Sequence, residues 1–327
     1  MDGAKATLNS LCTAMAILVM HLNTHWGDFV ESMASELSEN VDHVTALLLI
    51  IKYMADICDN DSIVIEDSIR QSFFNFMDNV AQQIFEGVFN YWAGKLLQSG
   101  LGVAASKTHP SAPGSAIPTD RQEIEALKLQ RLRSKLVDAF YCWIKLRLPD
   151  QVLETLTTNC AALIQLVFAE LETNKDENLE NATNCVIELI SVARKKANFS
   201  SIKQAVISKV EHLIGKVDQA VAENDEELGE QLMDIFVELG RDHAEQIIDN
   251  LTLTIPTILL KLMKIPNIQT RRQVTFWKTL FKCVEKIEDQ EVKRLKLQAL
   301  EPVLTQLMDE IVVHQRADDD IFEEFNY

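Results

Sequence analysis

Apolar residues spaced for one face of an α-helix recur along almost the whole chain, and this periodicity limits the folds open to it. The stretch TRRQVTFWKTLFKCVEKI, residues 270–287, shows the i, i+3, i+4, i+7 spacing most clearly. Its apolar positions are Val274, Trp277, Leu280, Phe281, Val284 and Ile287. Such a helix must bury its apolar face against other elements, and similar aromatic helices lie at Phe89–Trp92 and Phe140–Ile144. The recurrence predicts stacked helical hairpins.

Composition favours helices over strands. Hydrophobic residues make up 47% of the 327 residues, which is enough for a large core and too much for a disordered chain. The chain has only 10 Gly and 7 Pro, and β-branched residues nowhere alternate with polar ones for long. We therefore expect little or no sheet.

The predicted helices alternate with short polar connections. They cover residues 7–22, 26–37, 41–57, 66–98, 119–148, 149–156, 159–171, 179–197, 202–222, 228–249, 256–265, 270–287 and 292–314. Successive pairs repeat at about 40 to 55 residues, close to the length of HEAT and armadillo repeats. We predict an all-α fold over residues 1–327, an α-α superhelix (solenoid) of about six HEAT-like hairpins.

The alternative is a compact helical bundle closed around one core. Helices 7–22 and 44–57 are apolar on more than one side, which favours stacked layers over a bundle. The first of them should be buried on all sides, although a terminal repeat normally has a polar outer face. We expect that preceding helices are missing from this chain or that a partner covers it.

One segment interrupts the helical pattern. Residues 102–118 contain Pro110, Pro113 and Pro118 among Gly, Ser and Ala, and this composition is typical of a surface loop. A loop of this length is either functional or disordered. We interpret it as a disordered insert rather than a recognition element.

Charge and cysteine usage limit the class of protein. The formal charge of −18 argues against direct nucleic-acid binding, and it fits either a basic partner or a well-solvated surface. The six cysteines are widely spaced and lie mostly in apolar runs, which indicates small buried hydrophobes in a reducing compartment. We find no signal peptide, and no apolar run approaches the roughly 20 residues that span a membrane.

Motifs for enzymatic chemistry are not found in the sequence. There is no GxxxxGK[ST], no GxGxxG after a strand and no HExxH. His21 and His25 are four residues apart, but no carboxylate or Cys completes a metal set. We predict no catalytic residue, no cofactor and no metal.

The candidate partner-binding residues are acids at helix ends and in the acidic segment 317–327, which we interpret as a tail. They are Glu226, Glu227, Asp318, Asp319, Asp320, Glu323 and Glu324. A solvated helix start or tail explains such clusters more often than a binding site does. Trp92, Trp143 and Trp277 are expected in the core rather than as ligand platforms.

Five motifs, in their order along the chain, carry a resemblance to a known family. They are LNTHWGDFVESM (22–33), VTALLLIIKYMADI (44–57), FYCWIKL (140–146), VTFWKTL (274–280) and DDDIFEEF (318–325). Together they resemble the importin-β (karyopherin) superfamily, in particular its transportin-3/importin-13/Mtr10 branch. In that branch a similar Phe–Trp helix is followed by a similar acidic segment that contains Phe.

The resemblance implies a nuclear transport receptor rather than an enzyme. It implies HEAT repeats that bind protein cargo, here basic or Arg/Ser-rich, on an acidic inner surface. It also implies a response to Ran-GTP through the full-length protein, contacts with nucleoporins, and a location in cytoplasm and nucleus. Full members are much longer, so the chain would correspond to an internal or N-terminally truncated segment, and it need not bind Ran alone.

Two other functions are consistent with the sequence. One is a HEAT-repeat scaffold subunit of another complex, such as a phosphatase, because periodicity cannot separate it from a transport receptor. The other is a hydrolase in a helical domain, which would need a deep polar pocket with a perturbed titratable group.

Overall fold

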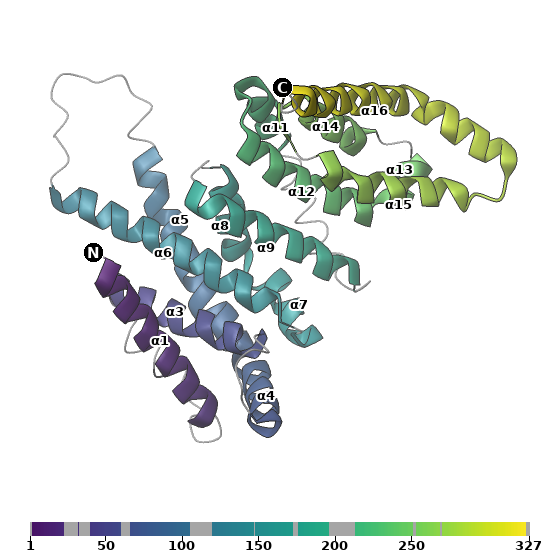
Figure 1. Ribbon diagram of the computed structural model, residues 1–327. Coiled ribbons are helices and arrows are strands. Elements are labelled where there is room, and N and C mark those ends of the chain that lie inside the picture. Colours follow the sequence, from purple (N-terminus) through teal and green to yellow (C-terminus); the bar gives the residue numbers. More distant parts are fainter. Residues whose placement is uncertain are drawn as a thin grey trace. The chain divides into compact units, whose positions relative to one another are not determined.

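The computed structural model describes residues 2–22, 32, 40–59, 66–104, 120–146, 148–172, 176–195, 213–250, 253–268 and 270–324. Every regular element in these residues is helical, which confirms the predicted all-α fold. The chain divides into two compact units, Met1–Glu188 and Leu189–Tyr327 (Figure 1). A single solenoid segment over residues 1–327 stays a prediction.

The first unit stacks its helices on their neighbours. Its elements are α1 (Asp2–Leu22), α3 (Val41–Asp59), α4 (Asp67–Gln83), the π-helix η1 (Ile84–Asn90), α5 (Tyr91–Ala104), α6 (Asp120–Ile144), α7 (Asp150–Thr158), α8 (Ala161–Glu172) and most of α9 (Asp176–Lys195). Helix α3 packs between α1 and α6, while η1 and α5 pack on α8. This order of contacts is that of stacked hairpins, with each helix sheltered by those next to it.

An aromatic cluster forms the centre of the first unit. The Phe85 ring lies edge-on to Phe140 and Trp143, with ring centroids 5.9 and 6.2 Å apart. Trp143 is fully buried, and its Nε1 donates a hydrogen bond to the Ile51 carbonyl at 2.8 Å. Phe89 also lies edge-on to Phe140, with ring centroids 6.1 Å apart, so the predicted aromatic cores around residues 89 and 140 meet in one place. Trp92 and Trp277 are also buried, as predicted.

The second unit is built around one strongly amphipathic helix. Its elements are α11 (Ile214–Glu223), α12 (Glu226–Asp242), α13 (Ala244–Asn250), α14 (Thr254–Leu262), the 3-10 helix η2 (Thr270–Gln273), α15 (Val274–Glu285) and α16 (Gln290–Glu324). Helix α12 contacts α11, α14, η2 and α15, and α16 packs on α14 and α15 (Figure 1).

Two predicted helix boundaries in the second unit are wrong. The helix predicted at 228–249 ends at Asp242, because the backbone of His243 (φ −108°, ψ 11°) leaves the α conformation and α13 begins anew. The helix predicted at 292–314 runs through Pro302 to Glu324, so the acidic segment predicted as a tail begins inside a helix. No Gly or Pro follows Pro302, so the sequence contains no stop signal before that point.

The buried face of α15 is rotated from the predicted one. Val274 and Phe281, expected in the apolar stripe, are 44% and 40% exposed, whereas Phe276 is fully buried. Phe276 packs against Gly240 of α12, where a Cβ would lie only 2.7 Å from the ring. The absence of a side chain at Gly240 therefore leaves the room that the Phe276 ring occupies on this face of α15.

Helix α1 is buried on one side only. Cys12, Ala16, Val19 and Met20 are buried, but Leu11 on another side is 60% exposed within the described residues. The prediction of burial on all sides is therefore wrong for the chain as it stands. The expectation that a further helix or a partner covers this side stays a prediction.

Some predictions fall on residues outside the described part. These include the helix at 26–37, the first part of the helix at 202–222 and most of the insert at 102–118. The insert was expected to begin at Gly102, but α5 extends to Ala104. Among the helices of the described residues, none is long and apolar enough to cross a membrane.

The cysteines behave as predicted for small apolar side chains. All six are free thiols, four are buried, and Cys142 and Cys283 are partly buried. Burial is the main cause that raises the pKa of the Cys142 and Cys160 thiols to about 12. Such thiols stay protonated at neutral pH and are poor nucleophiles.

Candidate partner-binding site

Four acids on α12 follow one another at intervals of four residues. They are Glu226, Glu230, Asp234 and Glu238. Side chains four residues apart are neighbours on a helix, each about 40° further round than the last, so these acids form a line that winds slowly along α12. We call these four residues the acidic ridge. The adjacent Glu227 lies beside its first member.

The ridge begins where the helix itself favours negative charge. Asp225 caps α12, its side chain accepting a hydrogen bond from the Leu228 amide at 3.0 Å. Glu226 and Glu227 occupy the first turn and are exposed, next to the positive end of the helix dipole. This placement by itself explains why Glu226 and Glu227 occur here. It agrees with the sequence-based interpretation that they are acids of a solvated helix start.

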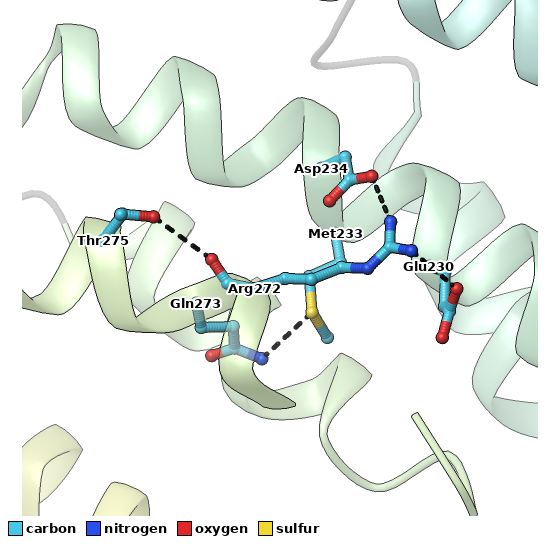
Figure 2. A network of polar contacts seen from close by, with 6 residues as sticks. All are labelled: Glu230, Met233, Asp234, Arg272, Gln273 and Thr275. Carbon is cyan, nitrogen blue, oxygen red and sulfur yellow. Dashed lines mark hydrogen bonds and ion pairs between the residues drawn. The ribbon is translucent and has the colours of Figure 1, made fainter. Parts of the chain in front are cut away.

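Arg272 binds the middle of the ridge. Figure 2 shows its guanidinium between two carboxylates, with Nη1 donating to Asp234 and Nη2 donating to Glu230 at 3.0 Å. The three side chains are 23–31% exposed, so the pairing is half-buried. A planar guanidinium that contacts two carboxylates in this way fixes η2 against α12.

The next residue, Gln273, joins η2 to α12, α14 and α15. Gln273 is 2% exposed, and its Nε2 donates to the Leu259 carbonyl of α14 at 3.0 Å and lies 3.6 Å from the Met233 sulfur (Figure 2). Its Oε1 accepts a hydrogen bond from Trp277 Nε1 at 3.1 Å. The segment that presents Arg272 is therefore held on three sides.

The outer members of the ridge also have partners within the chain. Glu226 accepts a hydrogen bond from Asn267 Nδ2 at 2.9 Å, and Asn267 has the positive φ of 60° that Asn tolerates. Glu238 pairs with Arg241 at 2.6 Å. The ridge is thus an acidic surface whose charge is partly balanced by one arginine at its centre and one at its end.

Asp234 is the ridge acid whose pKa is shifted. Burial is the largest cause and raises the pKa above its ordinary value, with a smaller contribution from the charge of Glu230. Arg272 opposes both through its charge and its hydrogen bond. Since the folded state holds the proton more tightly than the unfolded chain, this carboxyl contributes most stability below its unfolded pKa, and that contribution is lost as pH rises through the folded pKa.

Arg272→Gln should therefore destabilise the second unit more at neutral pH than in mild acid. The loss of two charged hydrogen bonds should cost about 1–2 kcal/mol at pH 7. The penalty should shrink near pH 4, because Asp234 then binds a proton and no longer needs the cation. Urea unfolding at the two pH values measures both penalties against wild type.

Lys261→Gln is the matched control. It removes an exposed pair with Asp218, whose side chains are 43% and 61% exposed, so the loss should stay below about 0.5 kcal/mol. A penalty for Arg272→Gln that grows on acidification would contradict the assigned role of the arginine.

Of the seven predicted contact acids, only the first two have described side chains. Asp318, Asp319, Asp320, Glu323 and Glu324 lie on the helical backbone of α16, and their side chains fall outside the described part. Three ridge acids, Glu230, Asp234 and Glu238, were not predicted. Their four-residue spacing from Glu226 is visible in the sequence, but the pairing with Arg272 joins positions 38 and 42 residues apart and is not.

The described side chains form no metal centre. No group of three or more His, Cys, Asp or Glu residues among them comes together closely enough to hold a metal ion. The chemistry that the ridge can perform is electrostatic, namely to attract and orient cationic groups.

Comparison with known proteins finds similarity to importin-13. No protein-family model matches the chain. The chain is 25% identical over 195 residues to importin-13 of Bos taurus, a match that covers 56% of this chain and 19% of the relative. Importin-13 of Homo sapiens and of Mus musculus match with the same identity and coverage. The match thus covers about a fifth of the length of these relatives.

Proposed function

We propose that this chain is a segment of a nuclear transport receptor of the importin-β superfamily. The observation that carries the proposal is the similarity to importin-13 over 195 residues in a chain built of stacked helices. It is a receptor function, not an enzymatic one. The finer placement in the transportin-3/importin-13/Mtr10 branch, and the truncation, belong to the proposal.

The cargo that suits the chain is a protein segment rich in arginine or in arginine and serine. The formal charge is −18, and the acidic ridge with Glu227 places five carboxylates along one helix. Arginine forks pair well with carboxylates, as Arg272 already does with Glu230 and Asp234. A basic cargo would bind at the exposed first turn of α12. Further along the ridge, its arginines would compete with Arg272 and Arg241 for the carboxylates.

The response to Ran-GTP and the contacts with nucleoporins are proposed for the full-length protein. Stacked hairpins touch mainly their neighbours, so small shifts at each interface add up to a change of curvature. Ran-GTP would act by binding a conformation of the receptor whose curvature differs from that of the cargo-bound conformation. Passage between cytoplasm and nucleus follows from that cycle, without direct nucleic-acid or membrane binding. The acids of residues 318–324 are proposed as further cargo contacts.

Charge reversal at the first turn of α12 tests the cargo surface. Glu226→Lys/Glu227→Lys should weaken binding of a fluorescent Arg-Ser repeat peptide about tenfold, which corresponds to about 1.4 kcal/mol. The wild-type affinity should fall as salt rises, because the contacts are exposed and screened. Fluorescence anisotropy at two salt concentrations measures both effects.

Glu288→Lys/Glu301→Lys provides the control. It changes the net charge by the same amount at two exposed acids, one before and one within α16, away from α12. If both double variants weaken binding equally, total charge rather than the ridge attracts the peptide. If neither does, the assignment of cargo to this surface is wrong.

A scaffold subunit of another complex is the second candidate. Stacked helices occur in both kinds of protein, so the all-α fold supports it as much as it supports a receptor. The two differ in Ran binding, which a scaffold has no reason to show.

A further inference from the structure

The buried residues of α4, η1 and α5 follow a period that an α-helix does not have. They recur every four residues along the run: Phe76 and Met77, Val80 and Ala81, Ile84 and Phe85, Val88 and Phe89, Trp92 and Ala93, and Leu96. An α-helix has 3.6 residues per turn, so each four-residue step overshoots by about 40°. Five steps would carry the buried stripe about 200° round the helix, to its opposite side.

The π-helix offsets about half of this drift. Segment Ile84–Asn90 has i to i+5 hydrogen bonding, which makes a wider turn and winds the stripe back. The apolar residues before and after it are therefore both buried, where a continuous α-helix would turn one set further away. A π-segment is equivalent to one residue inserted in an α-helix, and it persists only where its surroundings stabilise it.

The amino terminus of α8 supplies that stabilisation through one side chain. The Asn90 Oδ1 accepts hydrogen bonds from the amides of Ala162 and Leu163 at 3.1 and 3.2 Å. The Asn90 Nδ2 donates to the Asn159 carbonyl at 2.7 Å. The residue before α8 is Cys160, which is a poor cap, so Asn90 takes the part of a capping residue from another helix.

Two further contacts join the same pair of elements. The Cys160 thiol lies 3.7 Å from the Phe85 carbonyl, to which it donates, and the Asn159 Nδ2 donates to Glu86 at 2.8 Å. The start of α8 thus contacts η1 at its second, third and last residues. The π register and the position of α8 depend on the same hydrogen bonds.

We propose that η1 is a conformational joint whose π register is held by the docked amino terminus of α8. When Asn90 is released, Ile84–Asn90 takes up the α register, and α5 turns relative to α4 by about one residue, or 100°. The turning face carries Tyr91, which is 48% exposed, and Lys95, whose Nζ lies 4.5 and 4.6 Å from the ring centroids of Tyr91 and Trp92. Docking of α8 therefore controls which surface α5 presents.

Hydrogen exchange of the 327-residue chain tests the coupling. Asn90→Ala should raise amide exchange at least tenfold in two sets of peptides, those that cover the start of α8 and those that cover Ile84–Leu96. The other residues of η1 are unchanged in this variant. Asn90→Asp retains the two accepted bonds but loses the donor to the Asn159 carbonyl, so its exchange should lie between wild type and Asn90→Ala. Asn75→Ala, at an exposed position of α4, should change neither region.

A deletion variant distinguishes a conformational joint at η1 from a simple capping role of Asn90. Removing the exposed Gly87 takes out the surplus residue, so the run becomes continuous α-helix with α5 still facing the core. Its melting temperature should change by only a few degrees, and Asn90→Ala in that background should affect α8 alone. Removing Gln231 from α12, which has no π-segment, should lower the melting temperature several times more.

Two results would overturn the proposal. One is that Asn90→Ala raises exchange at α8 and leaves Ile84–Leu96 protected, which would reduce Asn90 to a cap. The other is that deletion of Gly87 is as damaging as deletion of Gln231, which would mean that η1 holds no surplus residue.

Discussion

Trp143→Ala should lower the free energy of unfolding of the first unit by about 4 kcal/mol. The indole is fully buried and touches Phe85 edge-on, so its removal leaves a large cavity at the aromatic centre. It also removes the donor to the Ile51 carbonyl, which joins α6 to α3. Urea unfolding followed by circular dichroism measures the loss.

Trp143→Phe separates the two contributions. It keeps an aromatic ring and removes the Nε1 donor, so it should cost about 1–2 kcal/mol. A loss below about 1 kcal/mol for Trp143→Ala would show that the cluster is not the centre of the first unit.

Gly240→Ala should destabilise the second unit by about 2 kcal/mol, although alanine is the better helix former. A Cβ at this position would lie 2.7 Å from two ring carbons of Phe276 and 3.0 Å from Ile255 Cγ2. Phe276 is fully buried and cannot move aside without disturbing α15. The collision should therefore exceed the gain of about 1 kcal/mol in helix propensity.

Gly215→Ala is the control, and its effect should have the opposite sign. Gly215 lies in the first turn of α11 with no atom within 4 Å of the added Cβ, so the substitution should stabilise by up to about 1 kcal/mol. Thermal unfolding of both variants gives the comparison. A stabilising Gly240→Ala would contradict the close packing of α12 on α15.

The helices were predictable because the apolar spacing that defines them is local. Helix α3 begins at Val41 as predicted, and α8 lies within two residues of its predicted bounds. The burial of Trp92, Trp143 and Trp277 followed from the same pattern. What spacing alone could not give is the partner of each face, such as the hydrogen bond from Trp143 to a carbonyl 92 residues away.

Two misses have identifiable signals in the sequence. The run 66–98 is predicted as one ordinary helix, but its buried residues follow a period of four, and this is the sign of the π-segment. Gly240 interrupts an apolar helix where no turn is needed, and a glycine at such a place indicates close approach by a neighbour. The identity of that neighbour, Phe276, depends on tertiary packing.

The candidate site was predictable only at its edge. Glu226 and Glu227 are predictable because they open a helix, and the structure places them at the exposed start of the acidic ridge. Arg272 is not predictable as part of the site, since the pair Arg271–Arg272 in a short 3-10 turn carries no local signal of its partners. Ion pairs between helices depend on how those helices cross, which one sequence does not reveal.

The most direct test of the proposed receptor function is Ran binding by the protein expressed from its own gene. The tagged protein, purified at low salt, is incubated with Ran loaded either with a non-hydrolysable GTP analogue or with GDP, beside a known importin as a positive control. We predict retention of Ran-GTP but not Ran-GDP, together with release of a bound Arg-Ser peptide by Ran-GTP. Failure to retain Ran-GTP under conditions in which the control does so would contradict the transport function and favour a scaffold.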